Sequence, residues 1–347
     1  MRALKKMGYA LCFGFMTVSC AQSSYFEAPV ANNQDACRHV KSSKSGYNDY
    51  DDAELITASG NHCLIGDLVS KPKFTFQWEG HPKTPRYMLA FASGGGVLNL
   101  NGHSVLGETP GTDGIKNIRP GVANIAIRNG RVVSATGSGI DLGGTVGLPG
   151  RIVMDYYNGY LDISSLKGGD LFDFKRDAHL LGGVGDRLKF PAKNVQIDSV
   201  VVVAGQGSNI AAGEDRFVNG IVLGGAGNVI RNSVIEVYSA NGAITLFGPN
   251  QLIENNRIVF KGRAAYPNSA PIKLTLGDSS IIRNNTIVIE DAEGSPKSAI
   301  SLTDSRNVII ENNKIEGVGA IYKAWDEYPG QRSSVQSKTN QLKAGRE

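Results

Sequence analysis

A short repeat along much of the chain sets the strongest limit on how this sequence can fold. Its common form is I-x-N-N-x-I, which occurs at residues 253–258, 282–287 and 310–315, with related segments at 127–132, 197–202 and 230–235. A second motif, Gly/Ala/Pro-Ile-x-Leu, falls between these segments and recurs at intervals of 25, 81, 23, 28, 28 and 21 residues. The chain is therefore a series of similar units of 21 to 28 residues, with one long interruption.

Each unit contains about three short strands that alternate apolar and polar residues, separated by turns rich in Gly, Asn and Ser. Glycine is 43 of 347 residues, about 12%, against an average near 7%. Neither a helical period nor a segment long enough for a crossover helix is evident, which argues against βαβ units. The Leu-x-x-Leu-x-Leu pattern of leucine-rich repeats is missing as well. The repeat therefore predicts an all-β solenoid, a parallel β-helix in which each coil stacks on the last.

In such a coil, alternate side chains such as Ile140 and Leu142 point inward and form stacked aliphatic rows. Asn at equivalent turns can stack its amides in a ladder, each side chain hydrogen-bonding to the next. We expect this structural role for the Asn pairs of the repeat, including Asn284.

The first 21 residues read as an export signal. Basic residues at Arg2, Lys5 and Lys6 precede an apolar run over 7–18, which is too short to span a membrane. Two kinds of processing fit: cleavage after Ala21, or bacterial lipoprotein processing with Cys20 as the lipidated residue. Both predict export to the periplasm or the exterior. The sequence contains no run of about 18 apolar residues, so we expect no transmembrane helix.

Net charge excludes one function class. The chain has 36 Lys+Arg against 32 Asp+Glu, but three of the bases leave with the signal segment and four more lie in the last 17 residues. The remaining body is close to neutral, which makes it a poor nucleic-acid binder by electrostatics.

Cysteine usage agrees with export. Cys12 and Cys20 belong to the signal segment, so the mature chain keeps Cys37 and Cys63. Neither has a His or Cys partner at metal-ligand spacing. We therefore expect a disulfide between Cys37 and Cys63, closing a loop of about 26 residues and contributing on the order of 3 kcal/mol.

Four segments follow from these observations. Residues 1–21 are the signal peptide, and 22–55 form an N-terminal cap, with a short helix around 35–40. The β-helix occupies 56–328. Residues 329–347 lack an apolar period and read as a flexible tail.

The segments 56–68 and 98–107, Ile-Thr-Ala-Ser-Gly-Asn-His-Cys-Leu-Ile-Gly-Asp-Leu and Leu-Asn-Leu-Asn-Gly-His-Ser-Val-Leu-Gly, resemble the opening coils of right-handed parallel β-helix proteins of the pectate-lyase-like superfamily. The resemblance covers about residues 54–325. It implies a right-handed coil but no single activity, because the superfamily includes lyases, hydrolases, epimerases and proteins without known chemistry.

The resemblance also implies a substrate groove along the outside of the strands that carry the Gly-Ile-x-Leu motif. Alternation predicts the outward residues of these strands to be Lys116, Asp141, Val222, Thr245, Lys273, Ser301 and Tyr322. Thr112-Asp113-Gly114-Ile115 matches part of a polygalacturonase motif, but the partner aspartates are missing, so Asp113 reads as a turn residue. A calcium-dependent lyase would need several clustered acids. The coils show no such cluster, so we expect no cofactor, with calcium as the alternative that the sequence leaves open.

Three insertions supply further candidates. The longest, 145–192, carries Tyr157, Arg176 and His179; 204–219 carries Asp215 and Arg216; and 261–270 carries Arg263 and Tyr266. Connections as long as the first are usually functional lids or disordered. We expect the three segments to enclose one site over Asp141, Thr245 and Lys273.

Two classes of function fit these features. The first is an exported enzyme acting on an acidic polysaccharide, most simply a lyase or epimerase, with His179 or Tyr157 as the base and Arg176, Arg216 or Lys273 neutralising the uronate carboxylate. Arg263 and Tyr266 would also contact the substrate. A glycoside hydrolase would use Asp141 and Asp215 as its two acids. The second class is a non-catalytic envelope protein that binds glycan or builds surface structure.

Overall fold

Short parallel strands make up almost all of the regular structure in the computed structural model of this chain. The structure describes residues 37–40, 54–56, 59–69, 77–78, 81–82, 87–92, 94–107, 113–117, 123–143, 162–171, 193–206, 218–290, 294–326 and 332–345. These residues belong to one unit, Cys37–Glu347. The predicted signal peptide and most of the predicted cap lie outside the described residues.

One sheet has nine parallel strands in chain order. They are β2 (Glu54–Ile56), β7 (Tyr87–Phe91), β10 (Asp113–Asn117), β12 (Ile140–Leu142), β14 (Asn219–Gly224), β17 (Gly242–Phe247), β20 (Ala270–Thr275), β23 (Ile300–Thr303) and β26 (Tyr322–Ala324). We call it the nine-stranded sheet. The Gly/Ala/Pro-Ile-x-Leu motif recurs at the strands from β10 to β26.

The other large sheet bends at a corner, so that most coils contribute one strand to each of two limbs. The first limb contains β1 (Arg38–Val40), β3 (Gly60–Leu64), β8 (Gly96–Asn99), β15 (Val229–Arg231), β18 (Leu252–Glu254), β21 (Ile281–Arg283), β24 (Val308–Glu311) and β27 (Val335–Lys338). The second limb contains β4 (Leu68–Val69), β9 (Ser104–Gly107), β16 (Val234–Ala240), β19 (Arg257–Ala264), β22 (Thr286–Ile289), β25 (Lys314–Glu316) and β28 (Gln341–Lys343). Two long strands, β11 (Ile125–Ser134) and β13 (Gln196–Ala204), run through the corner into both limbs. A separate two-stranded antiparallel sheet joins β5 (Gln77–Trp78) to β6 (His81–Pro82).

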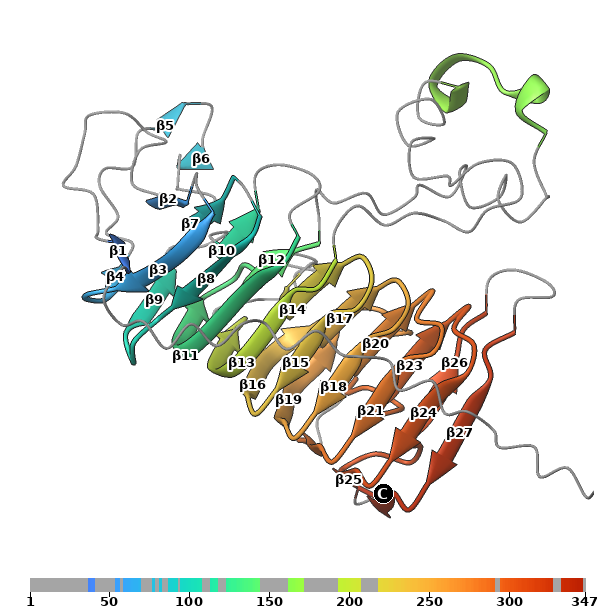
Figure 1. Cartoon of the computed structure of the whole chain (residues 1–347). Coiled ribbons are helices and arrows are strands. Elements are labelled where there is room, and N and C mark those ends of the chain that lie inside the picture. Colours follow the sequence, from blue (N-terminus) through green and yellow to red (C-terminus); the bar gives the residue numbers. More distant parts are fainter. Residues whose placement is uncertain are drawn as a thin grey trace, which may run out of the picture. The chain divides into compact units, whose positions relative to one another are not determined.

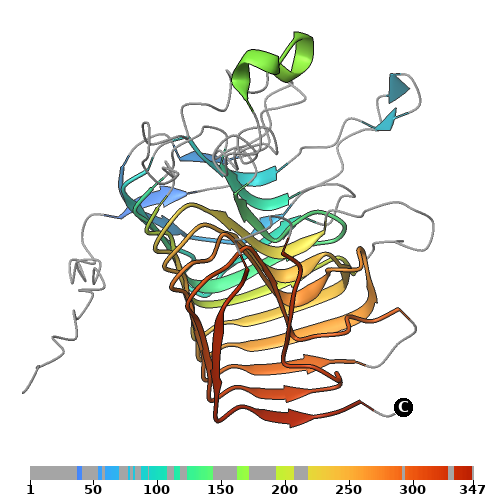
Figure 2. The same ribbon diagram turned by 90° about the vertical axis from the view of Figure 1, so that its right-hand side faces the viewer.

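Each coil passes from the nine-stranded sheet to the first limb, then the second limb, and returns one rung further along. Figures 1 and 2 show the coils stacked with equivalent strands side by side. Aliphatic side chains fill the interior in rows set by the strand register. The rows are Ile140, Ile221, Ile244, Ile272 and Ile300 in the nine-stranded sheet; Ile127, Ile197, Ile230, Ile253, Ile282 and Ile310 in the first limb; and Val132, Val202, Ile235, Ile258, Ile287 and Ile315 in the second, all at 0% exposure. The predicted parallel β-helix is confirmed.

The I-x-N-N-x-I repeat spans the corner between the limbs, and its two Asn residues have different tasks. The first, as at Asn284, is exposed and takes a left-handed backbone with φ of 56°. Asn tolerates this conformation better than most residues. The second, as at Asn285, is buried at 1% exposure. The expectation that Asn284 stacks in a ladder is therefore wrong, because its backbone turns the chain and its side chain faces solvent.

The ladder is built from the second residue of each pair. Its members are Asn256, Asn285, Asn313 and Asn340. In each step the backbone N–H and the side-chain Nδ2 both donate to Oδ1 of the next member, at 2.9–3.1 Å. The same Nδ2 also donates to an Ile carbonyl of the preceding coil, as from Asn285 to Ile253 at 3.0 Å. Each amide therefore joins three successive coils.

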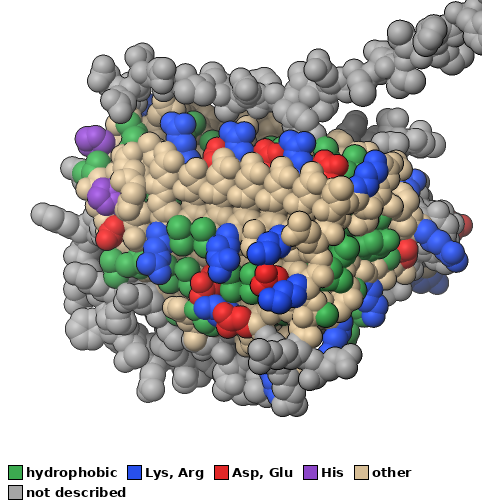
Figure 3. Space-filling model, turned by 90° about the horizontal axis from the view of Figure 1, so that it is seen from below, with side chains coloured by type: hydrophobic (Ala, Val, Ile, Leu, Met, Phe, Trp, Pro, Cys, Tyr) green, Lys and Arg blue, Asp and Glu red, His purple; other side chains and the backbone are tan. Residues whose placement is uncertain are grey.

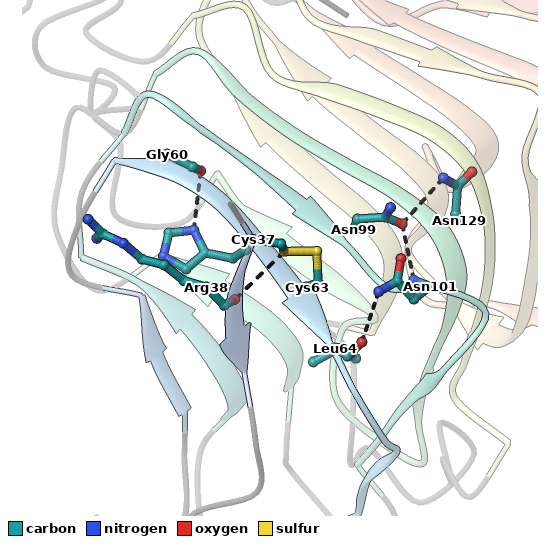
Figure 4. Close-up of a disulfide and its surroundings, with 9 residues drawn as sticks. Cys37, Arg38, Gly60, Cys63, Leu64, Asn99, Asn101 and Asn129 are labelled. Carbon is teal, nitrogen blue, oxygen red and sulfur yellow. Dashed lines mark hydrogen bonds between the residues drawn. A yellow bond between two sulfur atoms is a disulfide. The ribbon is translucent and has the colours of Figure 1, made fainter. Parts of the chain in front are cut away.

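The predicted disulfide between Cys37 and Cys63 is present, with Cα atoms 5.8 Å apart and 26 residues between them in sequence (Figure 4). It links the residue before β1 to β3, and these strands pair in parallel with His39 opposite Cys63. The helix expected around 35–40 is therefore wrong where the structure describes it, since 38–40 is a strand. A strand is favoured here because the neighbouring strand β3 offers backbone hydrogen bonds that a helix would leave unused.

The expectation of a flexible tail over 329–347 is also wrong. Within it, β27 pairs with β24 and β28 pairs with β25, in the register of the preceding coils. Residues 337–342, Ser-Lys-Thr-Asn-Gln-Leu, are a degenerate copy of the repeat in which Asn340 keeps the ladder position. The other substitutions hide its period in the sequence.

Replacing Asn285 by Leu should lower the free energy of unfolding by about 1–3 kcal/mol, because the buried N–H and Nδ2 of Asn256 would lose their acceptor. Chemical denaturation of the mature protein measures this change. The matched variant Asn284→Gly should change the free energy much less, since Gly also accepts a positive φ. Equal destabilisation by the two variants would contradict the division of roles within the pair.

Candidate functional site

The predicted site residues fall into two groups. Tyr157, Arg176, His179, Asp215 and Arg216 lie outside the described residues, as does most of the 145–192 insertion, of which a 3-10 turn at Ile163–Ser165 is described. The roles predicted for these five residues stay predictions. Asp141, Arg263, Tyr266 and Lys273 are described.

The outward residues of the nine-stranded sheet form one column along the stack. Register places Lys116, Asp141, Val222, Thr245, Lys273, Ser301 and Lys323 on successive rungs. The predicted column is thus confirmed as far as Ser301. On the last rung the register pairs Lys323 with Ser301 and Tyr322 with Ile300, while Tyr322 is 39% exposed and Ile321 packs against the core.

At its N-terminal end, the column is internally neutralised. Lys116 Nζ lies 2.7 Å from Asp113 Oδ2 and 3.7 Å from Asp141 Oδ2. Burial disfavours the charge on Lys116, but the two carboxylates outweigh it and raise the pKa of Lys116 above its usual value. Asp113 also accepts a hydrogen bond from Ser138 N at 2.8 Å. This bond connects the turns of two neighbouring coils. Asp141 accepts from Gly143 N at 3.1 Å.

Three rungs beyond Asp141, Lys273 has different surroundings. Its Nζ donates to Oδ1 of Asn241 at 2.5 Å and lies 3.4 Å from Oδ1 of Asn268. Among the described residues, no carboxylate lies within 4.0 Å of this ammonium, as the ion pairs found there show. Burial lowers the pKa of Lys273 from 10.5 to about 8. Lys273 is therefore a partly buried cation with neutral ligands.

Neutral polar side chains organise this end of the column. Thr245, buried at 4% exposure, donates its hydroxyl to Asn219 Oδ1 at 2.8 Å. Asn241 donates its Nδ2 to the same Asn219 Oδ1 at 3.3 Å. The other amide atom of Asn241, Oδ1, accepts the hydrogen bond from Lys273. The sequence analysis missed Asn219 and Asn241. No shared motif position marks them, because Asn219 directly precedes the motif that opens at Gly220, whereas Gly242 separates Asn241 from the motif that opens at Ala243.

The insertion expected over 261–270 is shorter in the structure, because β19 continues to Ala264. The remaining turn carries Tyr266, whose N–H donates to Ser269 Oγ at 2.9 Å. Ser269 in turn contacts Asn241 at 3.5 Å, so the backbone N–H of Tyr266 and the ammonium of Lys273 belong to one polar network. The structure does not bring Asp141 into that network.

Beside this turn lies a shallow, open depression of about 320 Å³. Its lining residues are Ala264, Ala265, Tyr266, Pro267, Gly294, Ser295, Pro296 and Lys297. At the far end of the column, Lys323 Nζ lies 4.0 Å from the centroid of the Trp325 ring, a cation–π contact. The C-terminal half of the column therefore offers cations and aromatic rings.

Within the described residues, no group of three His, Cys, Asp or Glu is close enough to hold a metal ion. That part of the chain also contains no helix long and apolar enough to cross a membrane.

The environment of Lys273 predicts a pH dependence of stability. Because its folded-state pKa is near 8 and its usual value is 10.5, the unfolded chain binds more protons between these values. The charged side chain therefore destabilises the fold fully below about pH 8, and this penalty is relieved as pH rises. Denaturation at pH 7 and pH 10 should show wild type gaining stability relative to Lys273→Met. The exposed control, Lys314→Met, should show no such gain, and an equal trend in both variants would contradict the assignment.

Comparison with known proteins agrees with the fold. Residues 193–336 match the family model described as a right-handed β-helix region. Two solved structures of PfbA, a surface protein and adhesin of Streptococcus pneumoniae, are similar to this chain at 12% and 13% identity. They cover 84% of this chain and 87% and 80% of their own, with TM-scores of 0.30 and 0.32. Similarity at this level carries no information on function. No curated protein sequence matches significantly.

The family match gives the hand of the coil, which the strand register alone does not state. It covers the region where the I-x-N-N-x-I repeat is most regular and where Lys273 lies. The stacked strands, the aliphatic rows and this match together identify the chain as a right-handed parallel β-helix repeat protein, in agreement with its resemblance to the pectate-lyase-like superfamily.

Proposed function

We propose that this is an exported protein that binds an acidic polysaccharide along the outer face of the nine-stranded sheet, with Lys273 as the anchoring cation. The observation that carries the proposal is the contrast between Lys116 and Lys273 in one column. Lys116 is neutralised by Asp113 and Asp141, whereas the partners of Lys273 among the described residues are amide oxygens without charge. A partly buried charge of this kind is stabilised by an anionic ligand.

The surroundings of Lys273 fit a polysaccharide better than a small anion. Lys323 lies two rungs further along the same column, a separation of about 10 Å from the usual strand spacing. Trp325 and Tyr266 offer flat rings at the two ends. A linear polymer with regularly spaced carboxylates can reach both cations while its sugar rings lie on the aromatic side chains.

Export is supported by the disulfide between Cys37 and Cys63, since such bonds persist in oxidising compartments. The apolar leader with its two processing alternatives adds to this proposal.

A catalytic form of the proposal rests on a second observation. The lowered pKa of Lys273, about 8, lies in the range where an amine can exchange protons near neutral pH. A lyase or epimerase would use the charged form of Lys273 to neutralise the uronate carboxylate, while a separate base removes the neighbouring proton. His179, Tyr157 and Arg216 remain its proposed partners. The hydrolase alternative, with Asp141 and Asp215, gains no support, because Asp141 is engaged by Lys116 and Gly143.

Binding can be tested with polygalacturonate as the acidic probe and dextran as the neutral one, by calorimetry on the mature protein. Wild type should bind polygalacturonate and not dextran, and the affinity should fall as pH rises past about 8 because Lys273 loses its charge. Lys273→Gln should weaken binding about tenfold or more, the loss of one charge-assisted contact. Lys338→Gln, with the same charge loss at an exposed position of the first limb, should bind as wild type does. An unchanged affinity in Lys273→Gln would show that the ligand does not use this site.

Turnover is a separate measurement on the same proteins. A lyase releases unsaturated products that absorb in the ultraviolet, and a hydrolase releases new reducing ends without that absorbance. If the protein is a lyase, His179→Ala and Arg216→Ala should each abolish product formation while leaving the thermal midpoint nearly unchanged. Binding by wild type without either product would support the non-catalytic alternative, a glycan-binding or structural envelope protein.

A further inference from the structure

We propose that the second limb carries an additional surface for a linear acidic polysaccharide, made by Arg131 and Arg257 with Val201 and Val234 between them. This surface lies on a different sheet from Lys273, so it is independent of the site described above.

The first evidence is a difference between two neighbouring outward columns. On the first limb, charges alternate in sign from rung to rung. That column reads Arg128, Asp198, Arg231, Glu254, Arg283, Glu311 and Lys338. On the second limb, the column next to the corner contains no acid. It reads Arg131, Val201, Val234, Arg257, Thr286, Lys314 and Gln341. Figure 3 shows both columns, with red and blue alternating in one and blue and green in the other.

The second evidence is that the nearby acids are already engaged. Asp198 is bound by Arg231 at 2.9 Å, and Glu254 by Arg283 at 2.7 Å. Glu236, the acid nearest in register to Arg257, lies 2.8 Å from Lys261 Nζ and also accepts from Tyr238. Arg257 influences Glu236 through longer-range electrostatics.

Arg131 and Arg257 themselves are exposed, and within the described part of the chain neither has an ion pair. On the same strand as Arg131, across the corner, Arg128 has a buried Nε without a hydrogen-bond partner. The surface therefore has an excess of positive charge over a body that is close to neutral.

Spacing and shape indicate an extended ligand. Arg131 and Arg257 are three rungs apart, about 14 Å at the usual strand separation. Between them Val201 is 37% exposed and Val234 is partly buried, which leaves a low apolar surface. The guanidinium group presents paired donors that match a carboxylate. A chain of uronates can place two carboxylates on the arginines and the C–H faces of its rings on the valines.

Two such surfaces on different sheets would let one protein molecule bind two polysaccharide chains and link them. This consequence rests on the proposed function at Lys273, whereas the second surface itself does not.

The test measures how many oligogalacturonate chains bind per protein, and how tightly, by calorimetry at low salt. The variants are Lys273→Gln, the double variant Arg131→Gln/Arg257→Gln and the triple combination. Wild type should bind two chains, Lys273→Gln and the double variant one each, and the triple variant none. Linking should appear as turbidity with long polygalacturonate in wild type and disappear in the double variant. Binding should weaken as salt is raised, since the contacts are exposed charges.

A matched control removes the same charge elsewhere. Arg306→Gln/Arg332→Gln alters two residues around the turns between the nine-stranded sheet and the first limb, and should bind as wild type does. Thermal midpoints should stay close to wild type in all variants. If the double variant keeps two chains at wild-type affinity, the second surface is wrong while the Lys273 site stands. If Lys273→Gln keeps two chains and the double variant loses one, the Lys273 site is wrong while the second surface stands. No binding of oligogalacturonate by wild type would overturn both.

Discussion

The side-chain amide of the second Asn in each repeat makes the hydrogen bonds that the backbone cannot make where the sheet bends. Where the chain turns between the limbs, the backbone cannot continue a regular ladder, so an N–H at the corner would be buried without a partner. Asn256, Asn285, Asn313 and Asn340 accept those N–H groups with Oδ1 and donate Nδ2 to a carbonyl of the preceding coil. An unsatisfied amide in this position would cost about 1–3 kcal/mol. The corner amides therefore hold the coils in one register.

Once the register is set, it decides which outward side chains become neighbours. In the first-limb column, each cation has an acid one rung away, and the pairs Arg231–Asp198 and Arg283–Glu254 form. A slip of one residue would move the aliphatic rows to the outside and the charges to the interior. The same register places Lys273 beside Asn241 and leaves Arg257 next to Val234. The binding surfaces that we propose are thus consequences of the stacking.

The sequence predicted the fold well where the repeat is intact and failed where it degenerates. The Ile positions on both sides of the Asn pair are strictly apolar from 230 to 315, and a period that regular has few structural solutions. In the last coil, Ser337 replaces the first Ile of the repeat and Thr339 replaces its first Asn, so the sequence predicts a tail where the strands β27 and β28 lie.

Prediction of the site was less complete for a different reason. Lys273 could be named from the alternation of its strand, and Tyr266 and Arg263 from the longer connection that precedes that strand. Asn219 and Asn241 could not, because an Asn that binds a lysine and an Asn that shapes a turn look alike in one sequence. The partners of Lys273 come from a neighbouring coil and from its own turn, and only the three-dimensional register reveals that they are neutral.

This distinction between paired and unpaired cations carries the functional argument. A cation next to an acid in the same column has its field cancelled at short range and contributes at most about 1 kcal/mol to stability when exposed. Lys116, Arg231 and Arg283 are of this kind. A cation that the stack leaves beside neutral groups keeps its field, and when partly buried it also bears a desolvation cost, as the lowered pKa of Lys273 shows. An anionic ligand removes that cost on binding. The cations that have no ion pair within the described part of the chain, Lys273 on one sheet and Arg131 and Arg257 on the other, are therefore the ones that an anionic partner outside the molecule would stabilise.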